Sequence, residues 1–309
     1  MEFLLLLLFV PFLFGDLFGG GDDEDDAPPT IEGTEGDDTL EGGAGDDLIH
    51  AGDGHDDLRG QAGNDTIFGG AGEDVLHGDD GNDRLNGEGD SDLLSGGEGD
   101  DSFDAGEGND RVDGGEGNDL IFGQGGNDTV WGSKGDDTVW LGDGDDWSNY
   151  DPSRQGALDG DNRVGGGNGN DMITDLSGSD TLTGELGNDT LVAIDFQQHD
   201  AQDSLNGGWG NDLVAGDDGD ALTGGGGQDD FGIFVDDGND RAVTITDFDP
   251  DRESLELVFN MPHPNSTDDL AMETDPETGD VTISYLGQPL AVLIDPGAFD
   301  LSKVIISAV

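Results

Sequence analysis

The chain has 309 residues, including 58 glycines and 74 acidic residues against 9 basic ones, and its net charge is −65. Only 32% of the residues are apolar, too few to offset the entropy of ordering the chain unaided. This charge excludes nucleic acid as a partner and disfavours anionic membrane surfaces. Because cysteine is absent, disulfides, thiolate metal sites and cysteine nucleophiles are excluded too.

The composition therefore requires another kind of cross-link. With roughly one unpaired negative charge for every five residues, the bare chain repels itself and should be disordered without counter-cations. Carboxylates on glycine-rich loops are ligands for a hard cation, and irregular coordination by many oxygens favours calcium over magnesium. We expect the chain to order only with bound cations.

An apolar amino-terminal segment covers residues 1–21, with the run FLLLLLFVPFLF at residues 3–14. That run is too short to span a bilayer comfortably. It has the length of the apolar part of a signal peptide, but Glu2 stands where a basic residue is expected and no A-x-A cleavage site follows. The hypotheses are an export signal or membrane anchor, a buried or lipid-facing end segment, and a misassigned start. Residues 22–32 are predicted to be a flexible acidic linker.

Residues 33–149 form the main array, in which one nine-residue unit recurs thirteen times without insertion or deletion. With Gly33 as position 1, position 6 is aspartate in every unit and never glutamate, although glutamate occurs at positions 2, 3, 5 and 9. A solvated acidic surface would tolerate either aspartate or glutamate at this position. A metal site that needs a side chain of one length would not. The predicted metal ligands of the array are Asp38, Asp47, Asp56, Asp65, Asp74, Asp83, Asp92, Asp101, Asp110, Asp119, Asp128, Asp137 and Asp146.

The other positions of the unit predict its backbone. Position 4 is glycine in twelve units, the exception being Asp90, and position 1 is glycine in ten, so we expect tight turns with positive φ. Position 8 is apolar in twelve units and fails only at Ser148. One inward side chain flanked by two outward ones describes a three-residue strand. Each unit is therefore predicted to be a six-residue turn and a short strand, with two units completing one coil.

These residues resemble the RTX, or hemolysin-type, calcium-binding repeat family, because GGAGDDLIH and GGEGNDLIF follow its pattern G-G-x-G-x-D-x-U-x. The resemblance implies a parallel β-roll in which calcium lies between the turns of units n and n+2. Position-6 carboxylates and backbone carbonyls of the glycine loops would hold about ten or more ions. Asp90, Leu141 and Ser148 depart from the pattern, which weakens the sites expected near the seventh and last units.

Residues 150–232 are predicted to continue the β-roll irregularly, with two insertions. The register is lost across YDPSRQGALDGDNRVG, resumes as GGNGNDMIT, DLSGSDTLT and GELGNDTLV, and breaks again at AIDFQQHD. Weaker units follow before Phe231. Further candidate metal ligands are Asp171, Asp180, Asp189, Asp212 and Asp229, and the least certain are Asp203 and Asp220.

Residues 233–309 are predicted to be a capping β domain, since a stack of repeats needs its exposed end closed. RAVTITDF, ESLELVF, DVTISYL and PLAVLI, separated by turn signals, predict antiparallel strands. The stretch that begins at Phe231 resembles the segment closing the roll in the secretion domain of serralysin-type proteases. The terminal DLSKVIISAV resembles an uncleaved signal for type I secretion; the alternative is an ordinary last strand.

No catalytic constellation is evident in the sequence. The five histidines are scattered, and neither an H-E-x-x-H nor a G-x-S-x-G motif occurs. Carboxylate pairs occur everywhere and so identify no acid and base. One surface feature suggests binding: Phe122 and Trp140, both at position 9 and 18 residues apart, should be neighbours on an outer sheet, where they could hold a sugar or a partner. The alternative is packing by the loop at 150–165.

The sequence thus predicts an all-β protein, a parallel β-roll (β-solenoid) of glycine- and aspartate-rich nonapeptide repeats capped by a carboxy-terminal antiparallel β region. The leading hypothesis is a secreted, extracellular calcium-binding protein that folds on binding several calcium ions and has no catalytic or organic-cofactor site. Its partners would be calcium ions and a type I secretion channel. The alternatives are a calcium-stabilised adhesin or matrix protein that binds a surface glycan, surface anchoring through residues 3–14, and an enzyme with a site in the carboxy-terminal domain.

Overall fold

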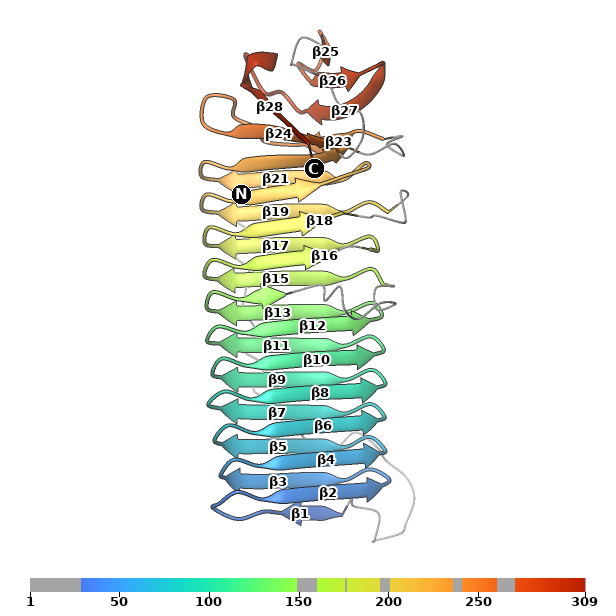
Figure 1. Ribbon diagram of the computed structural model, residues 1–309, viewed down its shortest axis with the longest axis vertical. Coiled ribbons are helices and arrows are strands. Elements are labelled where there is room, and N and C mark those ends of the chain that lie inside the picture. Colours follow the sequence, from blue (N-terminus) through green and yellow to red (C-terminus); the bar gives the residue numbers. More distant parts are fainter. Residues whose placement is uncertain are drawn as a thin grey trace.

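The computed structural model describes residues 29–148, 160–175, 177–194, 201–235, 241–259 and 270–308. The predictions for residues 1–21 and for linker residues 22–28 lie outside these residues. The flexible linker was wrong for residues 30–32, which form a strand paired in parallel with residues 48–50 and so begin the roll. The described chain winds into a long rod made of two stacked sheets (Figure 1). No helix in the described ranges is long and apolar enough to cross a membrane.

The strands alternate between the two sheets, odd numbers in sheet A and even numbers in sheet B until the carboxy-terminal end. In spatial order, sheet A contains β1 (Thr30–Glu32), β3 (Leu48–Asp53), β5 (Thr66–Ala71), β7 (Arg84–Gly89), β9 (Ser102–Glu107), β11 (Leu120–Gly125), β13 (Thr138–Asp143), β15 (Arg163–Asn168), β17 (Thr181–Leu186), β19 (Ser204–Trp209), β21 (Ala221–Gly226), β23 (Val243–Ile245), β27 (Gln288–Leu293), β26 (Val281–Tyr285) and β25 (Leu270–Thr274). Sheet B contains β2 (Thr39–Ala44), β4 (Asp57–Ala62), β6 (Val75–Asp80), β8 (Leu93–Glu98), β10 (Arg111–Glu116), β12 (Thr129–Lys134), β14 (Trp147–Ser148), β16 (Met172–Asp175), β18 (Thr190–Ala193), β20 (Leu213–Gly216), β22 (Asp230–Val235), β24 (Ser254–Phe259) and β28 (Val304–Ala308). A short 3-10 helix, η2 (Leu301–Lys303), precedes β28.

Two repeats complete one coil, as the period predicts. Within the main array each strand pairs in parallel with the strand 18 residues away, as in Ile49 with Ile67 and Val112 with Val130. The pairing keeps equivalent positions of the repeat in register along the whole rod. The predicted all-β parallel β-roll is therefore confirmed.

The strands are longer than the sequence predicted. Most strands of the array have six residues, running from position 7 of one unit to position 3 of the next, so the turn shrinks to positions 4–6. The three-residue strand was wrong because position-1 glycines do not have positive φ; that conformation falls at positions 2 and 4, as at Gly43 and Gly45. An extended residue at position 1 lets the strand continue.

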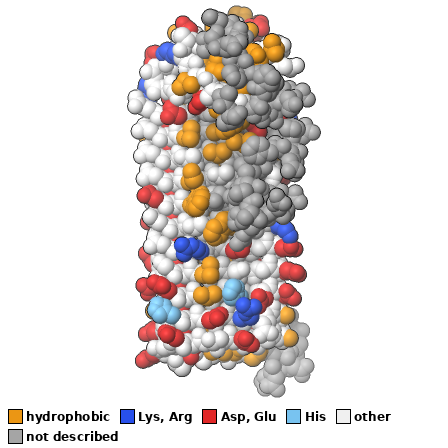
Figure 2. Space-filling model, viewed as in Figure 1, with side chains coloured by type: hydrophobic (Ala, Val, Ile, Leu, Met, Phe, Trp, Pro, Cys, Tyr) orange, Lys and Arg blue, Asp and Glu red, His pale blue; other side chains and the backbone are white. Residues whose placement is uncertain are grey.

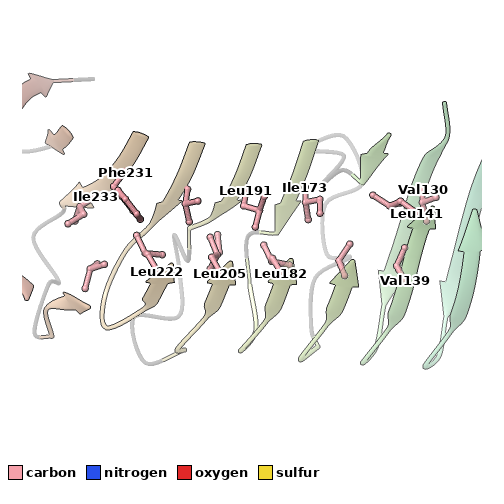
Figure 3. Close-up of a cluster of buried hydrophobic side chains, with 14 of the residues drawn as sticks. Val130, Val139, Leu141, Ile173, Leu182, Leu191, Leu205, Leu222, Phe231 and Ile233 are labelled. Atoms are coloured by element: carbon pink, nitrogen blue, oxygen red, sulfur yellow. The ribbon is translucent and has the colours of Figure 1, made fainter. Parts of the chain in front are cut away.

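The core is a single file of inward side chains between the two sheets. Position 8 supplies one buried apolar side chain in most units, the exceptions in the main array being the partly buried Leu40 and the polar Ser148, and position 1 also faces inward. Figure 3 shows Val139, Leu182 and Leu205 pointing from one sheet toward Val130 and Ile173 of the other. Because each unit buries so little apolar surface, the array's packing is thin compared with a globular core.

The array resumes one unit earlier than predicted. Strand β15 pairs with β13 in register, Val139 opposite Val164, so residues 157–165 end in a regular repeat rather than a loop. The unit was missed because Asn162 stands where the array has aspartate. The rest of the loop predicted over 150–165, residues 150–159, lies outside the described residues.

The carboxy-terminal end combines parallel and antiparallel pairing. Strands β23, β24 and β28 add in parallel to the open ends of the two sheets, whereas β25, β26 and β27 form an antiparallel ribbon. The predicted antiparallel region is confirmed for that ribbon, but the prediction was wrong for RAVTITDF and ESLELVF. The last coil of the roll leaves backbone N–H and C=O groups unpaired. RAVTITDF and ESLELVF pair with these groups in parallel, as the strands of the roll do.

Hydrophobic and acidic side chains are unevenly distributed over the outer faces of the sheets. Exposed hydrophobic side chains on sheet B include Leu93, Trp147, Met172 and Leu213, and Trp147 lies opposite Met172 in the register. On the face drawn in Figure 2, hydrophobic side chains gather along a line parallel to the long axis, with acidic side chains to both sides. The strong acidity of the chain therefore does not cover its whole surface.

Candidate metal sites

The position-6 residues form two ladders, one along each row of turns. In both, the backbone N–H of one residue donates to Oδ1 of the equivalent residue in the next coil; Asp65 N–H, for example, donates to Asp83 Oδ1 at 2.7 Å. The first ladder contains Asp38, Asp56, Asp74, Asp92, Asp110, Asp128, Asp146, Asp171, Asp189, Asp212 and Asp229. The second contains Asp47, Asp65, Asp83, Asp101, Asp119, Asp137, Asn162, Asp180, Asp203 and Asp220.

The ladders explain why position 6 is never glutamate. From Asp47 onward, every ladder aspartate is no more than 4% exposed, so the solvated-face alternative is excluded for these residues. The Oδ1 atoms lie 2.7–3.0 Å from the donating nitrogens, a distance that the aspartate side chain fixes. A longer glutamate would displace its carboxylate from both the donor and the interior.

The second carboxylate oxygen of most ladder residues is buried without a hydrogen-bond partner. Buried polar atoms are normally satisfied, and an unsatisfied one costs stability. Among the described residues, Oδ2 is unsatisfied in Asp47, Asp56, Asp65, Asp74, Asp83, Asp92, Asp101, Asp110, Asp119, Asp128, Asp146, Asp171, Asp189, Asp203, Asp212 and Asp229.

A backbone carbonyl lies close to most of these free oxygens, beside the position-1 glycine. A Cβ atom added to Gly42 would be 2.6 Å from Asp47 Oδ2 and 2.7 Å from the Gly60 carbonyl oxygen. At Gly69 the corresponding oxygens belong to Asp74 and to Gly87, at 2.6 and 3.1 Å. Position 1 is therefore glycine to leave room between two oxygens, not to supply positive φ.

This donor set fits calcium, which takes carboxylate and backbone carbonyl oxygens in flexible geometry. Among the described residues, no three histidine or acidic side chains converge as a metal cluster. A cation at a turn would therefore draw mainly on backbone carbonyls beside one or two carboxylates. Ala51, Ala105 and Leu141 carry side chains at position 1, which leaves less room in the units that they begin.

The electrostatics of the ladders also favour a cation. Burial raises the pKa of Asp92 and of Asp101 to about 8. The hydrogen bond that each carboxylate accepts from a backbone N–H lowers the pKa, but by less. For Asp128 and Asp137, burial raises the pKa to about 7, and neighbouring carboxylates add to the rise. Near neutral pH these groups therefore resist carrying their charge unless positive charge is close by.

Sequence comparison identifies the array. The chain matches the family described as RTX calcium-binding nonapeptide repeat (4 copies) over residues 30–58, 50–85, 59–94, 86–121, 113–148, 157–192 and 200–221, which together are more than half of its length. The chain belongs to this RTX family.

A structural comparison matches the chain to the extracellular lipase LipA from Serratia marcescens. The two chains are 18% identical over 76% of this chain, with a TM-score of 0.23. This chain spans 40% of the length of that lipase. No curated protein matches the RTX chain. The β-roll assignment therefore rests on the strand pairing and on the family match.

One RTX ladder residue was not predicted from the sequence, and two others were predicted only as the least certain metal ligands. Asn162 accepts the Asp137 N–H at 2.8 Å and donates its own N–H to Asp180 Oδ1 at 2.7 Å, so it occupies a ladder position with a neutral side chain. Asp203 and Asp220, the weakest candidates, are fully integrated into the same ladder. The pattern Gly-x-Asn before Arg163 was the available signal for the missed unit.

A second set of acceptors runs through position 5 of the RTX units, in the opposite direction. There the backbone N–H donates to the side chain one coil earlier, as from Asn82 to Asn64 Oδ1 at 2.8 Å. At His55 the Glu73 N–H donates to Nδ1 of the ring at 2.9 Å. Position 5 therefore satisfies turn amides that position 6 does not reach.

The predicted aromatic pair is present on sheet A. Phe122 lies opposite Trp140 in the register, as the 18-residue spacing requires. Trp140 is 37% exposed, and the Arg163 guanidinium lies 6.0 Å from its ring centroid. A Cβ at Gly165 would lie 2.8 Å from the same ring. The neighbouring strand β15 therefore covers part of Trp140, in line with the packing alternative.

Proposed function

We propose that this RTX protein is a secreted calcium-binding protein whose β-roll forms when calcium ions neutralise its buried carboxylates. The observation that supports the proposal most is the row of buried, unpartnered Oδ2 atoms along both sets of turns. A fold that buries so many unpaired carboxylate oxygens needs positive charge beside them. Arg59, Lys134 and Lys303 form ion pairs with Asp79, Glu116 and Asp251, none of which is a ladder residue.

The chain's own residues prepare each site. The backbone N–H of the preceding coil holds Oδ1, so Oδ2 is fixed beside the position-1 glycine and the carbonyl of the next coil. The residues that would hold calcium are the ladder aspartates and the position-1 carbonyl groups. Calcium, when bound, supplies the positive charge that these oxygens lack. Each site joins two successive coils, so binding and coil stacking support each other.

The energetics fit a folding switch. Extracellular modules bind calcium with a Kd of roughly 10⁻⁴ to 10⁻³ M. At a tenfold excess over Kd, each site adds about 1.4 kcal/mol to the free energy of unfolding. About ten sites would add about 14 kcal/mol, comparable with the whole stability of a typical domain.

The test of binding is a count of bound ions. The purified chain is stripped with EGTA, equilibrated with calcium, separated from free ions by gel filtration, and analysed for metal content. We expect about ten or more calcium ions per chain and little magnesium from an equal concentration. One or two bound ions, or equal retention of magnesium, would contradict the proposal.

The proposed switch also accounts for export. RTX repeats are typical of secreted proteins. Where calcium is scarce the acidic chain would stay unfolded and could be threaded through a type I secretion channel, and it would fold outside. The resemblance of DLSKVIISAV to a type I secretion signal supports this route. Removing residues 300–309 should abolish export by a co-expressed type I system; unchanged export would contradict this part of the proposal.

We also propose that this protein has no catalytic site of its own. The competing hypothesis, an enzyme with a site in the carboxy-terminal domain, can be tested with the calcium-loaded chain in a broad screen of esterase, protease and glycosidase substrates. We expect no turnover above a sample of the same protein in EGTA. Calcium-dependent turnover in this screen would overturn the non-enzymatic proposal.

A further inference from the structure

One row of side chains on the outer face of sheet A has an unusual order. Phe68, Asn86, Asp104 and Phe122 occupy position 9 in successive strands, and the register places each opposite the next. The row thus reads aromatic, amide, carboxylate, aromatic. With strands about 4.8 Å apart, its two phenyl rings are separated by about 14 Å along the rod.

A second polar row borders the first and encloses a hollow. Thr66, Arg84 and Ser102 lie at position 7 of the same strands. Together with Phe68, Asn86 and Asp104 they line a cavity of about 300 Å³. These polar side chains make no hydrogen bond or ion pair with other described residues, in contrast to the turn side chains, which are engaged coil by coil. The hollow therefore offers unused donors and acceptors on a rigid sheet.

Phe68 is held in place at one end of the hollow. One face of its ring stacks on His50, with ring centroids 4.6 Å apart and an interplanar angle of 5°. Since His50 lies on β3, on the side away from β7, the opposite face of the phenyl ring is turned toward the hollow. A side chain fixed in this way loses little entropy when a ligand stacks on it.

The chemistry of the hollow matches a sugar chain. An aromatic face packs against the apolar C–H face of a pyranose ring, while amide, carboxylate and guanidinium groups bind pairs of neighbouring hydroxyls. A concave site with a few convergent polar groups is the usual form of a small-ligand site. The net charge of −65 opposes sulfated or uronic acid polymers, so the sugar should be neutral.

We propose that the hollow lined by Phe68, Asn86 and Asp104, a groove on the outer face of sheet A beside Phe122, binds a neutral hexose oligosaccharide. The groove ends near Phe122, because the next aromatic residue, Trp140, is partly covered by Arg163 and Gly165. This inference rests on the proposed function, since residues on successive coils form the groove only when the calcium-bound β-roll is folded.

The test is isothermal titration of the calcium-loaded full chain with cellohexaose, laminarihexaose and mannohexaose, and with oligogalacturonate as a polyanionic probe. We expect at least one neutral hexasaccharide to bind, oligogalacturonate not to bind, and Phe68→Ala and Asn86→Ala each to weaken binding at least tenfold. Trp209→Ala is the matched control: Trp209 is 71% exposed on the same sheet but lies outside the groove, so binding should be unchanged.

Circular dichroism of each sample separates the two proposals. If the wild type shows a calcium-induced β signal but binds none of the neutral sugars, the groove assignment is overturned and the calcium proposal stands. If the calcium-induced signal itself is missing, the calcium proposal fails. If Phe68→Ala does not fold, sugar binding by Asn86→Ala and Arg84→Ala tests the groove assignment. Undiminished binding by both variants would overturn that assignment. Tighter binding of oligogalacturonate than of the neutral sugars would also overturn it.

Discussion

The main array and the carboxy-terminal end share one roll geometry but are stabilised differently. In the array most units bury one apolar side chain and one carboxylate whose Oδ2 lacks a partner. At the carboxy-terminal end, Phe248 makes edge-to-face contacts with Phe231 and with Phe299, both with centroids 5.8 Å apart. Phe259 and Tyr285 form a similar pair at 5.7 Å. The core of this end is therefore rich in aromatic contacts, whereas the array has a single file of mostly aliphatic side chains.

The same contrast appears in the charges. The Arg252 guanidinium donates to the Gly227 carbonyl, and it opposes the rise that burial causes in the pKa of Asp229. The Lys303 ammonium donates to the Pro250 carbonyl and pairs with Asp251. At this end the chain provides its own cations beside its oxygens. Under the proposed function, the array depends on metal because its core is thin and its four basic side chains, Arg59, Arg84, Arg111 and Lys134, are far fewer than its carboxylates.

The largest expected effect comes from pH in the absence of calcium. Burial raises the pKa of Asp74, Asp83, Asp92 and Asp101 to between about 6 and about 8 in the roll, above the ordinary 3.8 of the unfolded chain. The folded array thus binds more protons than the unfolded chain, so its stability is highest below pH 4 and falls as pH rises toward 8. Circular dichroism in EGTA should show more β structure at pH 5 than at pH 8; a signal that grows with pH would contradict this.

A core substitution should separate the two regions. Phe248→Ala removes a buried ring and should lower the free energy of unfolding of residues 243–308 by about 3–5 kcal/mol. The number of calcium ions bound by the array should not change. Hydrogen exchange of the carboxy-terminal peptides, with Ile305→Ala at a half-exposed site as the control, measures the first effect. Loss of calcium from the array would show that the regions are not stabilised separately.

A single ladder carboxylate should have a smaller and local effect. Asp83→Ala removes a buried Oδ2 and the acceptor of the Asp65 N–H, so we expect the loss of about one bound ion and about 1.4 kcal/mol of stability at tenfold calcium excess. Asp80→Ala removes the same charge from an exposed site three residues away. Urea unfolding at fixed calcium compares them, and equal effects would argue that only net charge matters.

The smallest expected effect comes from adding a methyl group at position 1, in the space between two oxygen atoms. In Gly69→Ala the new methyl group would stand 2.6 Å from Asp74 Oδ2, and calcium-dependent stability should fall by about 0.5–1 kcal/mol. Gly89→Ala, on the neighbouring strand, meets nothing within 4 Å and should change stability by less than about 0.5 kcal/mol. Calcium midpoints from circular dichroism provide the measurement. Indistinguishable midpoints would contradict the oxygen-lined space beside position 1.

The sequence predicted the features that depend on the repeat. The nine-residue period led directly to the two-unit coil, and the invariance of aspartate at position 6 indicated a side chain of fixed reach, as the burial of Asp92 and Asp101 shows. The family resemblance added the parallel β-roll. These features were accessible because each occurs many times, so a single exception such as Asp90 did not obscure the pattern.

Features that depend on packing between coils were not accessible. The reason for glycine at position 1 is a contact with an oxygen 18 residues away, which no local turn rule contains. Asn162 was missed because its role is defined by its partners, Asp137 and Asp180, and not by its residue type. The parallel addition of β23 and β24 depends on the open end of the roll as a template, whereas alternating apolar segments alone suggest hairpins.

The most direct test of the account is far-ultraviolet circular dichroism of the EGTA-stripped full chain during titration with calcium at pH 7.5. The account predicts a small β signal in EGTA, from the carboxy-terminal end, and a large cooperative increase as calcium fills the ladders. A β signal that is already complete in EGTA and unchanged by calcium would contradict it.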